Sequence, residues 1–315
     1  MKDRIIGVDL GGTQIRAALF DARAQILAQT AQETRAPQGA EAVFARIAAS
    51  IRAIADEWAR VQGIGVGAPG PLDPWRGIIL QAPNLPKLND FPLRARLEKE
   101  FAAPAFVGND ANVAALAEHR YGAGRGHSDM IYITISTGIG GGIICNNQLL
   151  LGARGFAGEV GHQILDPNGP PCNCGNTGCL EALASGPAIE RAARDALAQG
   201  RDSKLRALSE GDLEKISGAL ITRAAQEGDA LALEIYARAG HFIGAGLVNL
   251  LHIFDTQLFI LGGSVAKHAW EFLYPTLRAT FDKSALRSMR GGVGIVPAQL
   301  GDDVGLIGAM TLVVG

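Results

Sequence analysis

Three cysteines and one histidine lie close together within residues 158–181, a stretch rich in glycine and proline. Three thiolates and one imidazole complete the tetrahedral ligand set of a structural zinc site, and soft thiolates favour zinc over harder ions. The intervening glycines allow tight turns that direct near neighbours at one ion. The C-x-C spacing is shorter than the usual C-x₂-C. The predicted ligands are His162, Cys172, Cys174 and Cys179.

Other uses of these cysteines are buried apolar packing, a reactive thiol group or a disulfide. Three cysteines within eight residues of polar loop are not typical of core packing, and an odd number pairs badly. The chain opens on an apolar strand pattern with no export signal, so clustered cysteines favour a metal in a reducing compartment. We therefore expect a cytoplasmic protein. A zinc hydrolase would need an open coordination position, which a complete Cys₃His set does not leave.

Several carboxylates near these motifs are available for chemistry. Glu159 and Glu181 flank the cysteine cluster without being needed as ligands. Asp110 follows a strand and opens an alanine-rich helix, where the helix dipole favours its ionised form. An ionised aspartate can accept the proton of a hydroxyl that attacks phosphorus. The alternative for Asp110 is an ordinary helix N-cap, which is the commoner use of Asn-Asp before a helix.

Amide and imidazole groups near these acids extend the set of polar partners. Such a set suits a polyhydroxy substrate, because each sugar hydroxyl can donate to one acceptor. The residues concerned are Asn84, Asn109, Glu159, His162 and Glu181.

Three glycine-rich turns follow predicted strands, at residues 9–13, 137–142 and 262–264. Successive backbone N–H groups in such turns can bind phosphate oxygens. Neither a Walker A motif nor a G-x-G-x-x-G motif is present at these turns. Asp9 can hold Mg²⁺ and Thr13 can bond a terminal phosphate. The alternative for Asp9 is a carboxylate that caps its turn.

The elements that must position these groups alternate between strands and helices, which predicts an α/β fold. The N-terminal part reads as strands 5–10, 15–20, 26–30, 61–67 and 105–108, with helices 41–60, 93–101 and 110–121. After the glycine-rich segment 122–129 the opening pattern recurs as strands 130–136, 142–145 and 148–151. The recurrence predicts a duplicated architecture. Helices at 179–197, 213–226, 231–254 and 303–313 and strands at 257–261 and 295–296 complete the prediction, with a polar connection at 200–212.

The bulk composition excludes several classes of protein. A length of 315 residues allows two domains, and the net charge of −2 shows no basic excess for nucleic acid or an anionic membrane. The longest weakly polar run, residues 242–254, is too short to span a bilayer.

With these motifs the sequence resembles the ROK sugar kinases, and within them the bacterial ROK glucokinases. The matching motifs cover nearly the whole chain, and the cysteine motif together with E-x-G-H is highly specific. They are Asp9-Leu-Gly-Gly-Thr13, Gly108-Asn-Asp-Ala-Asn112, Thr137-Gly-Ile-Gly-Gly-Gly142, Glu159-Val-Gly-His162, Cys172-Asn-Cys-Gly-Asn-Thr-Gly-Cys-Leu-Glu181, Gly262-Gly-Ser264 and Gly301-Asp-Asp-Val-Gly-Leu-Ile-Gly308.

The resemblance implies an actin-like ATPase fold, related to ribonuclease H, duplicated into two lobes with a cleft between them. We expect an N-terminal lobe of residues 1–121, joined by a C-terminal helix at about 303–315. Residues 122–302 would form the C-terminal lobe with its zinc-binding loop. Family members commonly form dimers, so we expect a homodimer or a dimer of dimers.

The resemblance also implies roles for individual residues. Asp110 would be the catalytic base, and the sugar would bind Asn84, Asn109, Asp110, Glu159, His162 and Glu181. One ring nitrogen of His162 would bind a structural Zn²⁺ and the other a sugar hydroxyl. Mg·ATP would lie against the glycine-rich turns, at Asp9, Gly11, Gly12, Thr13, Thr137, Gly138, Gly140, Gly262 and Gly263.

The expected function is therefore an ATP-dependent hexose kinase, a glucokinase that phosphorylates the 6-hydroxyl of glucose. A kinase of N-acetylmannosamine or N-acetylglucosamine is the nearest alternative, with a fructokinase behind it. A non-catalytic sugar sensor is an alternative from another class. Some family members are repressors with an added N-terminal helix-turn-helix, for which the motif at residue 9 leaves no room.

Overall fold

The computed structural model describes residues 2–82, 85 and 88–315. Its first sheet has the strand order β3-β2-β1-β4-β7. The opening strands pair antiparallel, and β4 and β7 extend the sheet parallel to β1. The strands are β1 (Arg4–Leu10), β2 (Gln14–Asp21), β3 (Ile26–Glu33), β4 (Val61–Ala68) and β7 (Ala105–Asn109). A small hairpin, β5 (Leu72–Asp73) and β6 (Ile78–Ile79), lies in the connection after β4.

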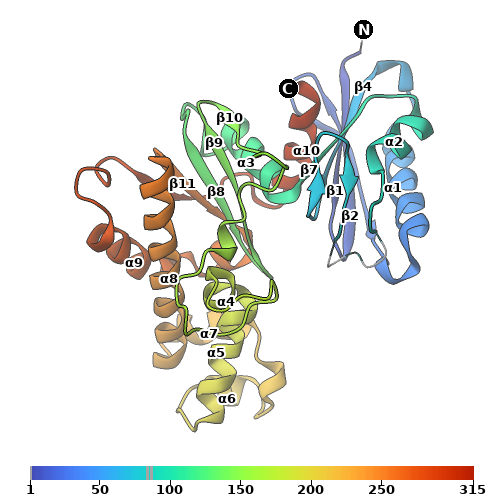
Figure 1. Ribbon diagram of the computed structural model, residues 1–315. Helices are drawn as coiled ribbons and strands as arrows, with labels where there is room; N and C mark the ends of the chain where they lie inside the picture. The colour runs from blue at the N-terminus through green and yellow to red at the C-terminus, as the bar shows by residue number, and fades with distance from the viewer. Residues whose placement is uncertain (1, 83–84, 86–87) are drawn as a thin grey trace.

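The second sheet repeats this arrangement with the order β10-β9-β8-β11-β12. The three strands that come first in the chain again pair antiparallel, and the two later strands extend the sheet parallel to the first of them. The strands are β8 (Met130–Ile135), β9 (Ile139–Cys145), β10 (Gln148–Leu149), β11 (Leu258–Gly262) and β12 (Gly294–Pro297). The identical strand order confirms the predicted α/β fold of two duplicated lobes, which lie side by side in Figure 1.

Helices cover both faces of the first sheet. The alternation of side chains along β1 sends Ile6 and Val8 to one face, where they pack with α1 (Ala40–Ile54) and α2 (Leu93–Phe101). The opposite face is covered by α10 (Val304–Val314), the last helix of the chain. A Cβ at Gly65 would lie 1.8 Å from the carbonyl oxygen of Ala309, so glycine is needed for this close approach. Figure 1 shows α10 against the sheet formed by the first residues.

Helix α3 (Asp110–Tyr121) lies between the two sheets. It packs against α10 on one side, and its Ala114 and Ala115 pack on Tyr132 and Ile144 of the second sheet on the other. The chain therefore passes between the lobes twice, once through α3 and once on its way into α10.

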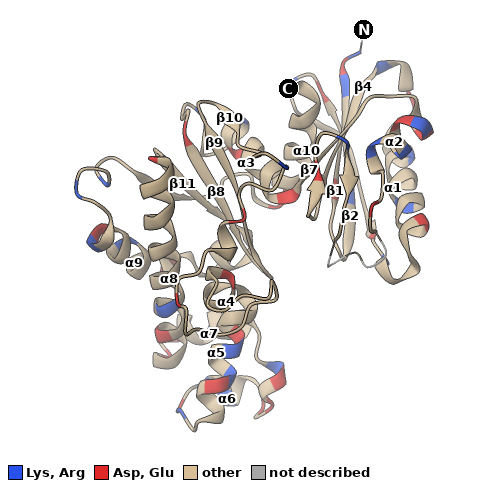
Figure 2. Cartoon of the chain, viewed as in Figure 1, with Lys and Arg blue, Asp and Glu red and all other residues tan. Residues whose placement is uncertain are grey.

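The other face of the second sheet carries the remaining helices. Gly240 and Gly244 let α8 (Ala230–Phe254) approach the backbone of α9 (Gly263–Ser284) at Leu273 and Leu277. The helices are α4 (Leu180–Ala184), α5 (Gly186–Ala198), α6 (Leu205–Leu208), α7 (Gly218–Gln226), α8 (Ala230–Phe254) and α9 (Gly263–Ser284). None of the helices within the described residues is long and apolar enough to cross a membrane. Acidic and basic residues are interspersed over both lobes in Figure 2.

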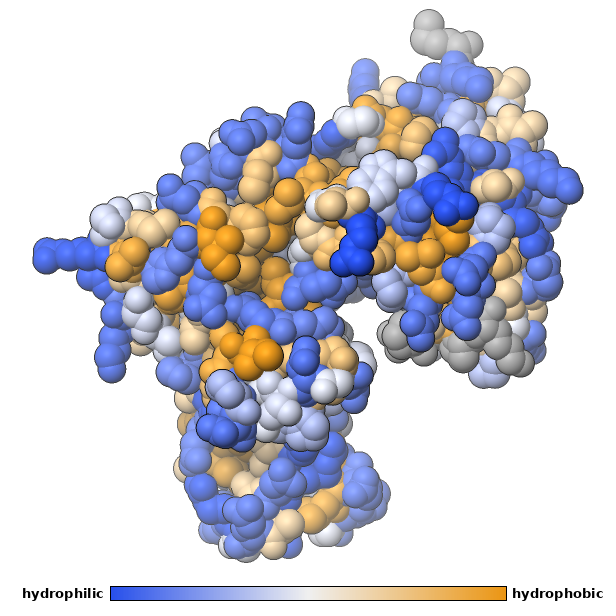
Figure 3. All heavy atoms as spheres, in the orientation of Figure 1, coloured by the Kyte–Doolittle hydropathy of each residue, from blue (hydrophilic) through white to orange (hydrophobic). Residues whose placement is uncertain are grey.

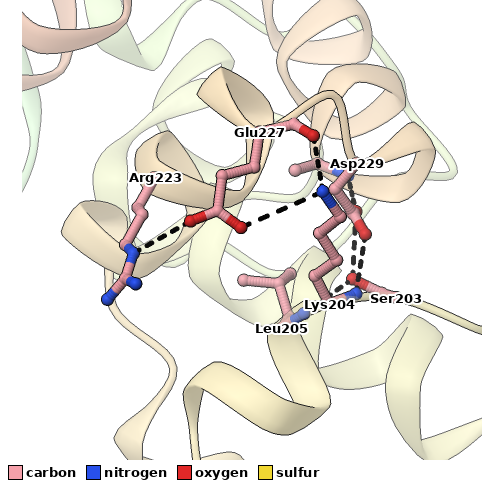
Figure 4. Close-up of polar contacts among 7 residues, drawn as sticks. Ser203, Lys204, Leu205, Arg223, Glu227 and Asp229 are labelled. Atoms are coloured by element: carbon pink, nitrogen blue, oxygen red, sulfur yellow. Dashed lines mark hydrogen bonds and ion pairs between the residues drawn. The ribbon is translucent and has the colours of Figure 1, made fainter.

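A polar network ties the segment before α7 to the start of α8 (Figure 4). The carboxylate of Asp229 is buried and accepts hydrogen bonds from the backbone N–H groups of Lys204 and Ala232 and from the hydroxyl of Ser203. The ammonium of Lys204 in turn donates to the carbonyl oxygen of Glu227. Asp229 is therefore the N-cap of α8 and the anchor of this outer segment.

Several predicted boundaries were wrong. The helix predicted over 41–60 ends at Ile54, and Trp58 instead stacks on Phe101 of α2. The predicted helix 179–197 is broken at Ser185, whose hydroxyl caps α5. The segment 200–212 contains α6, and the helix predicted to begin at 213 begins at Gly218.

The predicted glycine-rich turn 137–142 is also shorter than expected. Residues 139–142 belong to β9, and glycine is required there by packing and not by a turn. A Cβ at Gly142 would lie 2.5 Å from Cβ of Ala115 on α3, and one at Gly141 would lie 2.6 Å from Val160. These glycines therefore let α3 and the cysteine-rich loop approach the sheet.

Candidate active site

A cavity of about 700 Å³ lies between the two lobes, at the N-terminus of α3. Figure 3 shows the surface indented between the lobes. Its lining includes most of the predicted sugar site together with part of one predicted phosphate turn: Asn109, Asp110, Thr137, Gly138, Gly140, Glu159, His162 and Glu181. Residues 70–72 and 155–158, which were not predicted as site residues, also line it. Asn84 lies outside the described residues.

The two residues at the start of α3 have different roles, since Asn109 caps the helix and Asp110 faces the cavity. The side-chain oxygen of Asn109 accepts the N–H groups of Ala111, at 3.0 Å, and Asn112, at 3.3 Å. Asn109 is thus the N-cap, which leaves the carboxylate of Asp110 free to face the cavity with one bond from the N–H of Ala111. Because the Asn109 oxygen is occupied, its amide offers hydrogen-bond donors to a ligand and not the acceptor that we expected.

Asp110 lines the cavity and is in contact with solvent there. The pKa of its carboxyl is raised from 3.8 to about 6, chiefly by burial. The N–H of Ala111 opposes the rise, and the nearby charges of Asp9 and Glu159 add to it. From the sequence we expected the helix dipole to favour the ionised form of Asp110. The structure instead gives this carboxyl a raised pKa. The group remains mostly ionised at pH 7 but is a stronger base than an exposed aspartate.

The four predicted metal ligands converge at one point. Their ligand atoms all lie within 4.8 Å of one another. Sγ of Cys174 is 3.7 Å from Sγ of Cys179, and Nδ1 of His162 is 3.7 Å from Sγ of Cys172. A tetrahedron with Zn–S distances of about 2.3 Å has edges of about 3.8 Å, so the spacing suits zinc. His162, Cys172, Cys174 and Cys179 can therefore hold one tetrahedral ion.

The cysteine-rich loop also orients the groups beside it. With Nδ1 of His162 directed at Cys172, its Nε2 lies 3.9 Å from a carboxylate oxygen of Glu159 on the cavity side. From the sequence we expected the Glu181 carboxylate to be free. One of its oxygens instead accepts a hydrogen bond from the N–H of Ile139 at 2.9 Å. Glu181 thus connects the loop to the turn before β9, while its other oxygen remains near Cys172 at 3.9 Å.

The first predicted phosphate turn lies apart from this cavity. Asp9, Gly11, Gly12 and Thr13 are not among its lining residues. Asp9 instead forms an ion pair with Arg16, whose guanidinium also lies 4.0 Å from Asp303. Arg16 was not predicted as a site residue, although a hairpin that turns at residues 11–14 pairs position 9 with position 16. Asp9 still acts electrostatically on Asp110.

A second cavity of about 580 Å³ adjoins the first, and Thr134 lines both. Its lining includes Gly262 and Gly263 together with residues 297–299, 301 and 302. Gly263 has a φ of +86°, and a Cβ there would lie 2.4 Å from the backbone of Ile135, so only glycine suits this turn. The hydroxyls of Ser136 and Ser264 are 2.9 Å apart and join the turn before β9 to the start of α9. The two cavities can therefore hold parts of one extended ligand.

Comparisons with known proteins identify the family to which the chain belongs. The family model described as "ROK family" matches residues 5–315. The chain is 36% identical over 312 residues to a glucokinase of Thermotoga maritima, covering 99% of this chain and 98% of that protein. It is 31% identical to a xylose repressor of Caldicellulosiruptor bescii, covering 98% of this chain and 78% of the repressor.

Solved structures agree with the sequence comparisons. The crystal structure of a ROK family glucokinase from Streptomyces griseus, in complex with glucose and AMPPNP, superposes with a TM-score of 0.83 at 39% identity, covering 98% of each chain. The fold is therefore the two-lobe, actin-like ATPase fold of the ROK sugar kinases. On its sequence, its fold and the matched residues 5–315, the chain belongs to the ROK family.

Proposed function

We propose that the protein is an ATP-dependent hexose kinase that transfers the γ-phosphoryl group of Mg·ATP to the 6-hydroxyl of glucose. The observation that carries this proposal is the position of Asp110, a carboxylate with raised pKa that faces one cavity with Glu159 and His162. The adjoining cavity provides room for a nucleotide beside Gly262 and Gly263. The glucokinases among its relatives support the same activity.

In the proposed reaction the sugar occupies the first cavity. Glu159, Glu181 and Nε2 of His162 accept hydrogen bonds from sugar hydroxyls, and the amide of Asn109 donates one. Asp110 takes the proton of the attacking hydroxyl as that oxygen bonds to the γ-phosphorus, and the bond from this phosphorus to the β,γ-bridging oxygen breaks to release ADP. Backbone N–H groups of the turn that contains Thr137 and Gly138, and the Mg²⁺ that ATP brings with it, neutralise the transferred phosphate.

We assign a structural Zn²⁺ to His162 and the three cysteines. When bound, the ion fixes the loop that carries Glu159, His162 and Glu181, so that these groups meet the sugar without a cost of ordering. A reducing cytoplasm would keep the thiolates available as ligands. The first turn, with Asp9 and Thr13, is proposed to reach the phosphates on the first-lobe side. A homodimer is proposed from the resemblance.

The pH dependence of turnover tests the proposed base. Because only ionised Asp110 can accept the proton, kcat is expected to fall tenfold per unit of pH below about 6 and to be level above about pH 7. The measurement is kcat for glucose from pH 5 to 8.5, with circular dichroism at each pH to show that the fold persists. A level profile between pH 5 and 7 would contradict the assignment.

A coupled assay over a panel of sugars tests the substrate. Glucose is expected to give the highest kcat/KM, with fructose, N-acetylmannosamine and N-acetylglucosamine at least tenfold lower. Faster turnover of an N-acetylhexosamine would assign the protein to the nearest alternative. Sugar binding with no turnover on ATP, ADP or polyphosphate would indicate a sensor.

A further inference from the structure

Glu118 is a buried carboxylate that the proposed reaction does not use. It lies near the end of α3 and is fully buried, at 0% exposure. It lies eight positions after Asp110, which is about 12 Å along the helix axis. A negative charge in the last turn of a helix is unfavourable for the helix dipole, so local helix chemistry does not explain it.

The two oxygens of Glu118 bind backbone from both places where the chain passes between the lobes. One oxygen accepts the N–H groups of Gln299 and Leu300, each at 2.9 Å, in the segment that leads into α10. The other accepts the N–H of Ala123, at 2.9 Å, in the segment that leads from α3 to β8. A single side chain thus fastens both interlobe connections to the helix that begins with Asp110.

One of these connections is also a wall of the second cavity. Ala298, Gln299, Gly301 and Asp302 line it together with Gly262. The N–H of Ala298 is bound by the carbonyl of Leu261, so this end of the segment belongs to the sheet. The next two residues, Gln299 and Leu300, are held at their backbone N–H groups by Glu118.

The glycine beside this carboxylate supports a specific arrangement. A Cβ at Gly122 would lie 2.0 Å from a carboxylate oxygen of Glu118, so a side chain there would displace it. Two backbone N–H groups of the same turn, at Gly122 and Gly124, also donate to the carbonyl oxygen of Glu118. Both the side chain and the main chain of Glu118 therefore organise this connection.

We infer that Glu118 is a positioning residue, which holds the wall of the nucleotide cavity in register with the helix that carries the base. The inference rests on the proposed function and deepens it. Loss of Glu118 frees Gln299 and Leu300 relative to Asp110, so the phosphate donor is misplaced while the sugar contacts remain. Its signature is an effect on ATP and on kcat without an effect on glucose affinity.

The test compares Glu118→Gln and Glu118→Ala with Asp229→Asn as a matched control. Asp229 is also a buried carboxylate that binds two backbone N–H groups and one hydroxyl, but it lines neither cavity (Figure 4). Glu118→Gln keeps one acceptor oxygen, so it is the variant to use if the alanine variant does not fold. Calorimetry with glucose and with a non-hydrolysable ATP analogue accompanies steady-state kinetics and melting temperatures.

We expect Glu118→Gln to raise KM for ATP and lower kcat by about tenfold each, because charge-assisted bonds are replaced by weaker ones and one N–H loses its acceptor. Glucose Kd should stay within twofold, and Asp229→Asn should lower only the melting temperature. If the Glu118 variants lose stability but keep KM for ATP and kcat, the inference is wrong and the proposed function stands. If the unaltered protein phosphorylates no hexose, both fail.

Discussion

Asp110→Asn is expected to lower kcat for glucose by about 10³-fold while glucose binding stays within a few-fold of normal. The amide has the size of the carboxylate, and its oxygen can still accept the N–H of Ala111. It cannot accept a proton at neutral pH, and general-base catalysis typically contributes 10² to 10⁴ in rate. Sugar contacts through Glu159 and His162 do not require the base.

Kinetics and calorimetry on the same preparation decide this prediction. Asn112→Ala, two residues along α3, is a control for damage to the helix, because Asn112 lines the same cavity without carrying a charge. The remaining activity of Asp110→Asn should also lose its dependence on pH near 6. Turnover within tenfold of the unaltered protein would show that another group accepts the proton.

The same substitution has a predicted effect on stability. The folded-state pKa of about 6 lies above the ordinary 3.8, so the protonated form is favoured by folding. The stability that Asp110 contributes is present below pH 4 and is lost as the pH rises through 6. Asp110→Asn should therefore raise the melting temperature at pH 8 and have no such effect near pH 4.

Loss of the metal is the second large effect. Cys179→Ala removes a fully buried ligand and is expected to abolish stoichiometric zinc and to raise KM for glucose by about 100-fold. The reason is that Glu159, His162 and Glu181 lie on the loop that the ion holds, so their ordering would have to be driven by the sugar. The first lobe has its own core and should keep its structure.

Cys145→Ser provides the matched control, because Cys145 lies on β9 outside the ligand set. Metal content by mass spectrometry and KM for glucose and for ATP are measured for both variants. KM for ATP should change much less than KM for glucose in Cys179→Ala. A metal-free variant with normal KM for glucose would contradict the proposal that the ion orders the sugar-binding loop.

Much of the fold could be predicted from the hydrophobic pattern, because both lobes begin with the same succession of strands and turns. Apolar strands joined by glycine turns predicted both sheets, and the cysteine spacing predicted a convergent ligand set. Boundaries were less accurate where a contact distant in sequence decides the structure. Gly141 and Gly142 were assigned to a turn because their need for close packing on Val160 and Ala115 is invisible in the sequence.

The electrostatics of the site were the least predictable part. The pKa of Asp110 depends on the cavity and on Asp9 and Glu159, which are far from it in sequence. Arg16 and Glu118 were overlooked for a similar reason, since single charged residues in a strand or helix usually face solvent. Only the assembled lobes show that one neutralises Asp9 and the other joins the two interlobe connections.

The most direct measurement is a crystal structure with glucose bound, with diffraction collected on both sides of the zinc absorption edge. The account predicts an anomalous peak among Nδ1 of His162 and the three sulfurs, and a sugar whose 6-hydroxyl is within hydrogen-bond distance of Asp110. A ligand set without zinc, or a glucose molecule whose 6-hydroxyl points away from Asp110, would contradict it.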